Sequence, residues 1–107
     1  MANVYTNAKV DLTTTNVTTL YTAPALTTSI VNSIIVSEDS GNADTITATI
    51  TDSASAVFSL FKTKAVSANA TTELLTAPLV LQTGEVLKVT AATAGRLHVV
   101  ASVLEIG

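Results

Sequence analysis

Residues 27–37 constrain the fold of this 107-residue chain more than any other stretch. They are dense in β-branched residues, which lose less side-chain freedom on a pleated strand than in a helix. In an extended strand Ile34 and Val36 lie on one face while Val31 and Ile35 lie on the other, so both faces carry large apolar groups. The pattern predicts a central strand that is covered on both sides and around which the other segments are arranged.

Turn residues divide the rest of the chain into short segments with the pattern of strands. The strongest turn signal is Asp39-Ser40-Gly41-Asn42, because Gly and Asn tolerate positive φ while Asp and Ser can cap local amides. Residues 43–51 then alternate between apolar side chains and threonine, so the segments on either side of this turn are expected to form a hairpin. Further strands are expected over residues 9–12, 17–22, 56–64, 71–75, 86–91 and 96–106, and residues 79–81 are expected to lead into the turn at 83–85.

The spacing of these segments defines the expected fold class. About eight short strands, with turns roughly every 8–12 residues, are typical of an antiparallel β-sandwich or a jelly roll, so we expect an all-β fold. The segment 96–106 has apolar residues on both faces, and we expect it to lie centrally beside the opening stretch. Residues 1–8 have no clear period and are expected to form an N-terminal arm that is ordered only when docked. Residues 9–107 are expected to form one domain.

The surface of such a domain would carry little charge. Charged residues make up 12% of the chain, about half the usual share, and threonine is the commonest residue with 20 copies. A free β-sandwich must protect its edge strands from pairing with other chains, and lysine is a common means. We therefore expect partner subunits to cover edges or faces of the sheets, the alternative being that threonine hydroxyls alone solvate the surface. The cationic residues are Lys9, Lys62, Lys64, Lys88 and Arg96.

Several functional classes find no support in the composition. The net charge is −3 and no basic stripe exists, so we do not expect nucleic-acid binding. The chain has no cysteine and one histidine, so neither a disulfide nor a zinc site is expected. No apolar run approaches the ~18 residues that a spanning helix needs, and the first residues lack the pattern of a secretory signal. We therefore expect no membrane association.

The residues also offer no catalytic constellation. His98 lies in the middle of an expected strand, which indicates a partly exposed strand histidine rather than a member of a Ser-His-Asp arrangement. Glu38, Asp39 and Asp44 surround a turn, where solvated carboxylates are common. This turn supplies oxygens but lacks the spacing and the bidentate glutamate of a calcium loop. We expect no enzymatic activity, no cofactor and no metal.

The four aromatic residues bear on sugar binding, which usually requires aromatic platforms. Tryptophan is absent, and Phe58 and Phe61 fall on opposite faces of one expected strand, so at most one of them can be exposed. Tyr5 and Tyr21 could serve as platforms, and packing in the core or in an interface is the favoured interpretation for both.

Two stretches carry a recognisable pattern. The early one is Thr19-Leu20-Tyr21-Thr22-Ala23-Pro24 followed by residues 27–36, and the late one is Leu81-Gln82-Thr83-Gly84-Glu85-Val86-Leu87-Lys88-Val89-Thr90-Ala91 followed by residues 95–106. In this pattern the chain resembles small virion structural proteins of tailed bacteriophages over nearly everything after residue 15. The likeness consists of strand patterning and turn residues and includes no catalytic signature.

The resemblance implies a β-sandwich that is bound to a phage particle. In its length the chain is similar to head decoration (cement) proteins, which commonly sit as trimers over capsid symmetry axes and brace neighbouring major capsid subunits. The resemblance therefore implies a virion protein that is made in the host cytoplasm and lies at the capsid surface. The implied partners are the major capsid protein and further copies of the chain itself, in a homotrimer. We expect Val4 and Tyr5 of the arm to contact a neighbour. The alternative is a head- or tail-fibre module that binds a host receptor or glycan.

Overall fold

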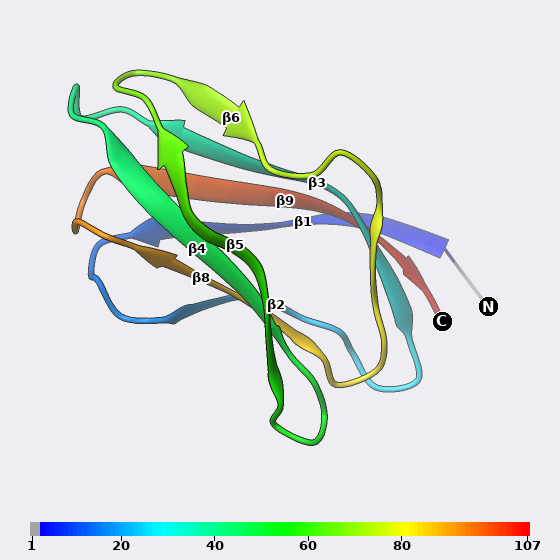
Figure 1. The fold of residues 1–107 in the computed structure, drawn as a ribbon. Coiled ribbons are helices and arrows are strands. Elements are labelled where there is room, and N and C mark those ends of the chain that lie inside the picture. The colour runs from blue at the N-terminus through cyan, green and yellow to red at the C-terminus, as the bar shows by residue number, and fades with distance from the viewer. Residues whose placement is uncertain (1–2) are drawn as a thin grey trace.

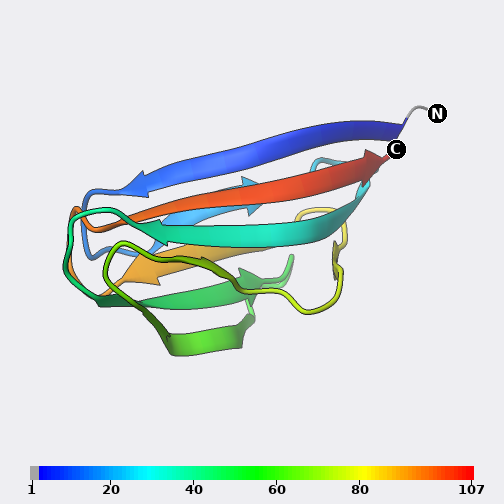
Figure 2. The same ribbon diagram turned by 90° about the horizontal axis from the view of Figure 1, so that it is seen from above.

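The computed structural model describes residues 3–107, and over this range the chain forms nine strands in two antiparallel sheets that pack face to face (Figures 1 and 2). The first sheet has the order β1-β9-β3-β6, with β7 also paired with β3, and the second has the order β2-β8-β4-β5. The expected all-β sandwich is confirmed. The strands are β1 (Asn3–Leu12), β2 (Thr18–Thr22), β3 (Thr28–Glu38), β4 (Asp44–Thr51), β5 (Val57–Val66), β6 (Thr71–Glu73), β7 (Leu79–Leu81), β8 (Val86–Ala91) and β9 (Leu97–Ile106).

The long strands β3 and β9 form the middle of the first sheet. They pair along their length, from Thr28 opposite Ile106 to Glu38 opposite Leu97, so the expected neighbourhood of these two segments is confirmed. Their inward side chains are fully buried against the second sheet, and each large aliphatic group buried in this way stabilises the fold by about 1.5–3 kcal/mol. The buried core is aliphatic, and among its members are Leu12, Val31, Ile34, Val36, Ile46, Leu87, Val89, Leu97 and Val99.

The prediction that β3 is covered on both faces is wrong. Ile34 and Val36 are buried as expected, but Ile35 on the opposite face is 37% exposed. Val31, which strict alternation would place beside Ile35, is also fully buried, because the register of β3 against β9 shifts between Val31 and Ser33. Such a bulge turns one half of a strand over relative to the other. Val31, Ile34 and Val36 therefore reach the core, while Ile30 and Ile35 lie on the outer face.

The predicted hairpin at the Asp39–Asn42 turn is also wrong. The strand before the turn, β3, belongs to the first sheet, while β4 after it belongs to the second. The turn is therefore an arch between the layers. Both strands have one strongly apolar face, and an arch lets these two faces pack against each other instead of lying side by side in one sheet. The turn residues identified a change of direction, but they did not specify which partner each strand would take.

The expected arm over residues 1–8 is, from Asn3 onward, part of β1. This strand pairs with β9 from Asn3 opposite Ile106 to Leu12 opposite Leu97. Residues 1–2 lie outside the described residues. Ala8 and Val10 pack against the core, while the other side of β1 is exposed. The periodicity of this segment is weak because β1 is the edge strand of its sheet. The segment is ordered by its pairing with β9, which the sequence pattern did not indicate.

Candidate functional site

The outer face of the first sheet carries a row of four apolar side chains that crosses four strands. Tyr5 on β1 lies opposite Leu104 on β9, Leu104 lies opposite Ile30 on β3, and Ile30 lies opposite Val80 on β7. Antiparallel partners share a face and stand about 5 Å apart, so each side chain of the row lies next to the following one across the sheet. Tyr5 is 78% exposed and Val80 is 53% exposed, while the two central residues are half-buried.

A second row on the same face lies closer to the arch. It runs from Lys9 through Val100 and Ile35 to Glu73, so two aliphatic side chains are flanked by one positive and one negative charge. Both aliphatic residues are more than one-third exposed. A polar row, Asn7, Ser102 and Ser33, separates the two apolar rows.

The outer face of the second sheet has a different chemistry. Its outward positions on β4 and β8 are mostly threonines, and the one charged member is Lys88. Hydroxyls hydrogen-bond to water, so most of this face is solvated, and its aliphatic members are Val86 and the 63% exposed Val57 on either side of Thr51. The two sheets thus present one partly apolar and one largely hydroxyl-covered face to the outside. The outward residues of the second face include Thr45, Thr47, Thr49, Lys88 and Thr90.

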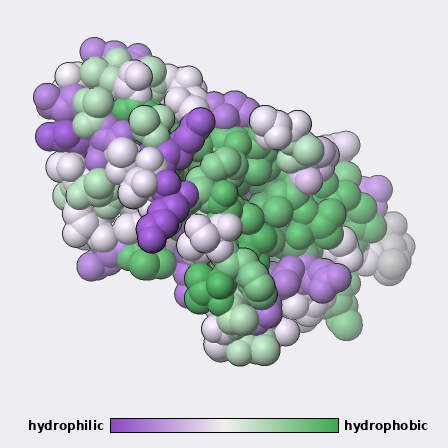
Figure 3. Space-filling model, in the orientation of Figure 1, coloured by the Kyte–Doolittle hydropathy of each residue, from purple (hydrophilic) through white to green (hydrophobic). Residues whose placement is uncertain are grey.

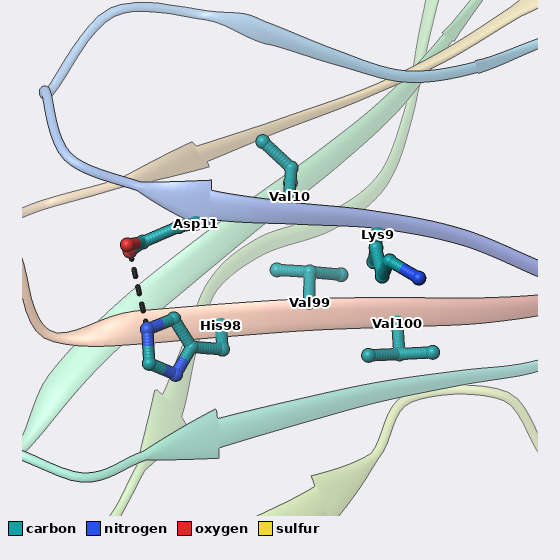
Figure 4. Close-up of a pocket in the computed structure, with 6 residues that line it drawn as sticks. All are labelled: Lys9, Val10, Asp11, His98, Val99 and Val100. Carbon is teal, nitrogen blue, oxygen red and sulfur yellow. Dashed lines mark ion pairs between the residues drawn. The ribbon is translucent and has the colours of Figure 1, made fainter.

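His98 lies beyond the second apolar row, on the outward side of β9. Its Nε2 atom is 3.2 Å from Oδ1 of Asp11, and its Nδ1 atom is 3.4 Å from Oδ2 of Asp39, with all three side chains about half-exposed. Figure 4 shows Asp11 pointing at the imidazole beside a shallow pocket of about 300 Å³. A neutral imidazole has one N–H and can donate to one of these carboxylates, whereas the protonated ring can donate to both.

This arrangement does not favour catalysis or metal binding at His98. Both ring nitrogens face carboxylates, so neither is directed at a serine or free to ligate a metal. Within residues 3–107, no group of three or more His, Cys, Asp or Glu side chains is arranged to hold a metal ion. His98 is the partly exposed strand histidine that its position indicates, but the sequence did not reveal that Asp11 and Asp39 come together beside it.

A buried carboxylate organises the arch between the sheets. Glu38 at the end of β3 accepts hydrogen bonds from the backbone N–H groups of Ser40, Gly41 and Asn69, at 2.8, 3.0 and 3.0 Å, and from the Ser40 hydroxyl. Burial alone would raise the pKa of Glu38, but these hydrogen bonds outweigh it and lower the pKa from 4.5 to about 2. Glu38 is therefore a structural residue and is not available as a proton donor at neutral pH.

Glu73 fills the gap between the two short strands at the other edge of the first sheet. Strand β3 pairs with β6 through residues 35–37 and with β7 through residues 29–31. Between these ladders, the Glu73 carboxylate accepts hydrogen bonds from the backbone N–H of Ile34 at 2.8 Å and from the Ser33 hydroxyl. Burial would raise the pKa of Glu73, and these hydrogen bonds hold it below its usual value. The carboxylate thus satisfies the Ile34 backbone N–H in the interval between the β6 and β7 ladders.

Tyr21 links the two sheets at the opposite end of the sandwich. Its hydroxyl reaches from β2 to the Ser29 hydroxyl, 2.8 Å away, and donates a hydrogen bond to the Glu105 carboxylate. Burial and the bond to Glu105 raise the pKa of Tyr21 to about 12. The residue thus packs between the layers, in agreement with the interpretation as a core or interface aromatic.

Val4 and Tyr5, the residues expected to contact a neighbour, both lie on β1. They are 49% and 78% exposed, respectively, and alternation puts them on opposite faces of the strand. The structure therefore does not place them in a separate arm. Sequence reasoning missed the remaining members of the apolar rows, because Ile30, Val80 and Leu104 come together only through the register of three strands.

In comparisons with known proteins, no protein-family model and no curated protein matches the chain. Over residues 3–107 no helix is long and apolar enough to cross a membrane. The fold and the site thus define a small antiparallel β-sandwich with one partly apolar outer face.

Proposed function

We propose that this chain is a non-enzymatic structural subunit that docks on a larger assembly through the outer face of its first sheet. In its particular form, the proposal is a decoration protein that binds the outside of a tailed-phage head and stabilises contacts between major capsid subunits. The observation that carries it is the apolar row of Tyr5, Leu104, Ile30 and Val80 on one face, set against the threonine-covered face opposite. The phage setting rests on the resemblance described above.

The dimensions of this face suit such a contact. About four strands spaced at 4.8 Å, each some nine residues long at 3.3 Å per residue, give roughly 600 Å² per subunit. Counting both partners, about 1,200 Å² would be buried, which is the lower end of the range for specific protein–protein interfaces. Apolar area is also flanked by Lys9 and Glu73, which would lie at a polar rim. A single subunit would bind weakly, and many subunits on one shell would act together.

The mechanism of stabilisation follows from linkage. A subunit that binds only the closed shell lowers the free energy of that shell and not that of its separated subunits, so the shell gains stability by mass action. No catalytic group takes part. His98, which carries the only imidazole, has both ring nitrogens directed at carboxylates.

The test compares particles that carry the chain with particles from which it has been removed. Removal should lower the rupture temperature, and adding back the purified chain should restore it. Val80→Lys, which places a charge in the apolar row, should fail to restore it, whereas Thr45→Lys on the outer face of the second sheet should restore it fully. An unchanged rupture temperature after removal would refute the proposal.

The second candidate is a fibre module that binds a receptor or glycan. Two exposed aromatic side chains favour it, Tyr5 on the first sheet and Phe58, which is 56% exposed, on β5 of the second. Because these residues lie in different sheets, they would give two single platforms and no continuous aromatic surface. Glycan-array binding that is lost in Tyr5→Ser or Phe58→Ser would support this function, and an array without hits would remove it.

A further inference from the structure

Among the described residues, the four edges of the two sheets are protected to very different degrees. β6 and β7 are three residues each, and the segment between them contains Pro78. β2 has five residues and a register shift against β8. β5 is longer but has two register shifts and carries Lys62 and Lys64. Short length, bulges, proline and lysine are the usual means of keeping other strands from adding to an edge.

β1 lacks most of these devices. It is ten residues long, and its pairing with β9 runs over Asn3–Leu12 without a register shift. Its one cation is Lys9, and it contains no proline. Within residues 3–107, no strand pairs with its outer edge, which Figure 2 shows at the margin of the molecule. A straight and unprotected edge offers a complete row of backbone donors and acceptors to another strand.

The sequence of β1 is self-complementary about Asn7. When the strand is placed antiparallel to a copy of itself, with Asn7 opposite Asn7, the aliphatic residues meet each other, the amide residues meet polar groups, and no two like charges stand opposite each other. The resulting pairs are Asn3 with Asp11, Val4 with Val10, Tyr5 with Lys9, and Thr6 with Ala8.

We propose that a second copy of this chain pairs antiparallel along the free edge of β1, with a two-fold axis at Asn7. On the inner side, Val4, which is 49% exposed in the single chain, is then covered by Val10 of the second copy. On the outer side, the Tyr5 ring lies against the aliphatic stem and ammonium group of Lys9, an arrangement in which both apolar contact and cation–π attraction are favourable. The contact is isologous, as expected for a closed dimer.

This pairing would join the two first sheets into one continuous sheet and place their apolar rows on one common face. It accounts for the exposure of both Val4 and Tyr5, which lie on opposite faces of the strand and cannot both be covered by a partner on one face. It gives a two-fold contact instead of the homotrimer that the resemblance implies. The dimer does not depend on the proposed function, because it follows from the edge and the sequence of β1 alone.

Cysteine cross-linking tests the register directly, since the chain contains no native cysteine. In the proposed dimer the two Asn7 Cα atoms are about 5 Å apart, within reach of a disulfide, so Asn7→Cys should give a covalent dimer under mild oxidation. Lys9→Cys is the matched control on the same edge and face. Its two cysteines would stand about 14 Å apart, beyond disulfide reach, and should cross-link on the order of tenfold more slowly.

A mixture of the Tyr5→Cys and Lys9→Cys variants should cross-link to each other, because these positions are directly opposite in this register. Sedimentation of the unmodified chain over a concentration series should show monomer and dimer. The proposal is overturned by a monomer or trimer mass throughout the series. It is equally overturned if Asn7→Cys cross-links no faster than Lys9→Cys, or if the mixed pair does not cross-link. Circular dichroism of each variant confirms that the sheets are intact.

Discussion

The outer faces of the two sheets are built on the same strand geometry and differ in what they show to the outside. On the second sheet the outward positions of β4 and β8 are mostly threonines, whose hydroxyls can hydrogen-bond to water, and Val86 is the one aliphatic member. On the first sheet the corresponding positions of β3 and β9 include Ile30, Ile35, Val100 and Leu104. A sandwich needs apolar residues only on its inner faces. The outer apolar residues of the first sheet are therefore not explained by the stability of the single chain.

Figure 3 shows the side of the molecule that carries the second sheet, and a green, apolar area is also visible there, beside this sheet. Several residues that border the core are only partly buried, namely Ile50, Leu60, Phe61, Leu75 and Leu79. These residues still contact buried neighbours. The rows on the outer face of the first sheet differ, because residues 3–107 form no third sheet that would cover them.

The largest expected change in the free energy of unfolding distinguishes an inward from an outward side chain of the same strand. Ile34→Ala removes a fully buried side chain of β3 and should lower the free energy of unfolding by about 2–5 kcal/mol. Ile35→Ala at the next position removes a side chain that is already 37% exposed and should cost less than about 1 kcal/mol. Urea denaturation of both variants measures the difference. Equal losses would show that something in the single chain covers the outer face.

The next effect concerns the arch that holds the two sheets together. The folded-state pKa of Glu38 is about 2 and its ordinary value is 4.5, so the carboxylate contributes stability above pH 4.5 that is lost as the pH falls toward 2. Glu38→Gln should lower the denaturation midpoint at pH 7 and flatten the pH dependence between these limits. Asp52→Asn in the β4–β5 turn is a control for loss of an acid at a turn. A steep acid transition that persists in Glu38→Gln would contradict this role.

A smaller effect is expected at the other contact between the layers. Tyr21→Phe removes the hydroxyl that bridges β2 to Ser29 and Glu105, and a buried hydrogen bond of this kind contributes about 1 kcal/mol. The pKa of Tyr21 is raised to about 12, so the stability that the hydroxyl provides is complete below pH 10 and is lost as the pH rises toward 12. Thermal melts of both proteins from pH 8 to 12 should converge at the alkaline end. Parallel curves would count against the bridge.

The smallest change in stability is expected from exchanging the chemistry of the two outer faces. Val100→Thr makes the first face resemble the second, and Thr45→Val does the reverse. Each should alter the free energy of unfolding by about 0.5 kcal/mol or less, because both positions are on the surface. Only Val100→Thr should weaken binding to the assembly, measured by co-sedimentation with particles that lack the chain. The comparison of the faces fails if both variants bind as well as the unmodified chain.

Much of the fold could be predicted from the sequence, and the errors have a common cause. Strand positions followed from local alternation, and the pairing of β3 with β9 followed from their two apolar faces. The hairpin prediction failed because residues 39–42 specify a reversal but not whether it stays in one sheet. The burial of Val31 depends on a bulge against β9, and the order of residues 3–8 depends on pairing with the same strand. These features are set by partners that are distant in sequence.

The candidate site was predictable only in part for the same reason. Val4 and Tyr5 could be named because large apolar groups in a segment without an obvious core role are noticeable in the sequence. Ile30, Leu104 and Val80 each resemble an ordinary strand residue, and only the cross-strand register places them in one row. The neighbourhood of His98 with Asp11 and Asp39 likewise joins three separate segments.

Side-chain footprinting of the chain, alone and bound in its assembly, tests the central claim most directly. The apolar row at Tyr5, Ile30, Val80 and Leu104 should be labelled in the free chain and strongly protected in the bound form. Lys88 on the outer face of the second sheet should be labelled equally in both. Protection of Lys88 with unchanged labelling of the apolar row would contradict the account.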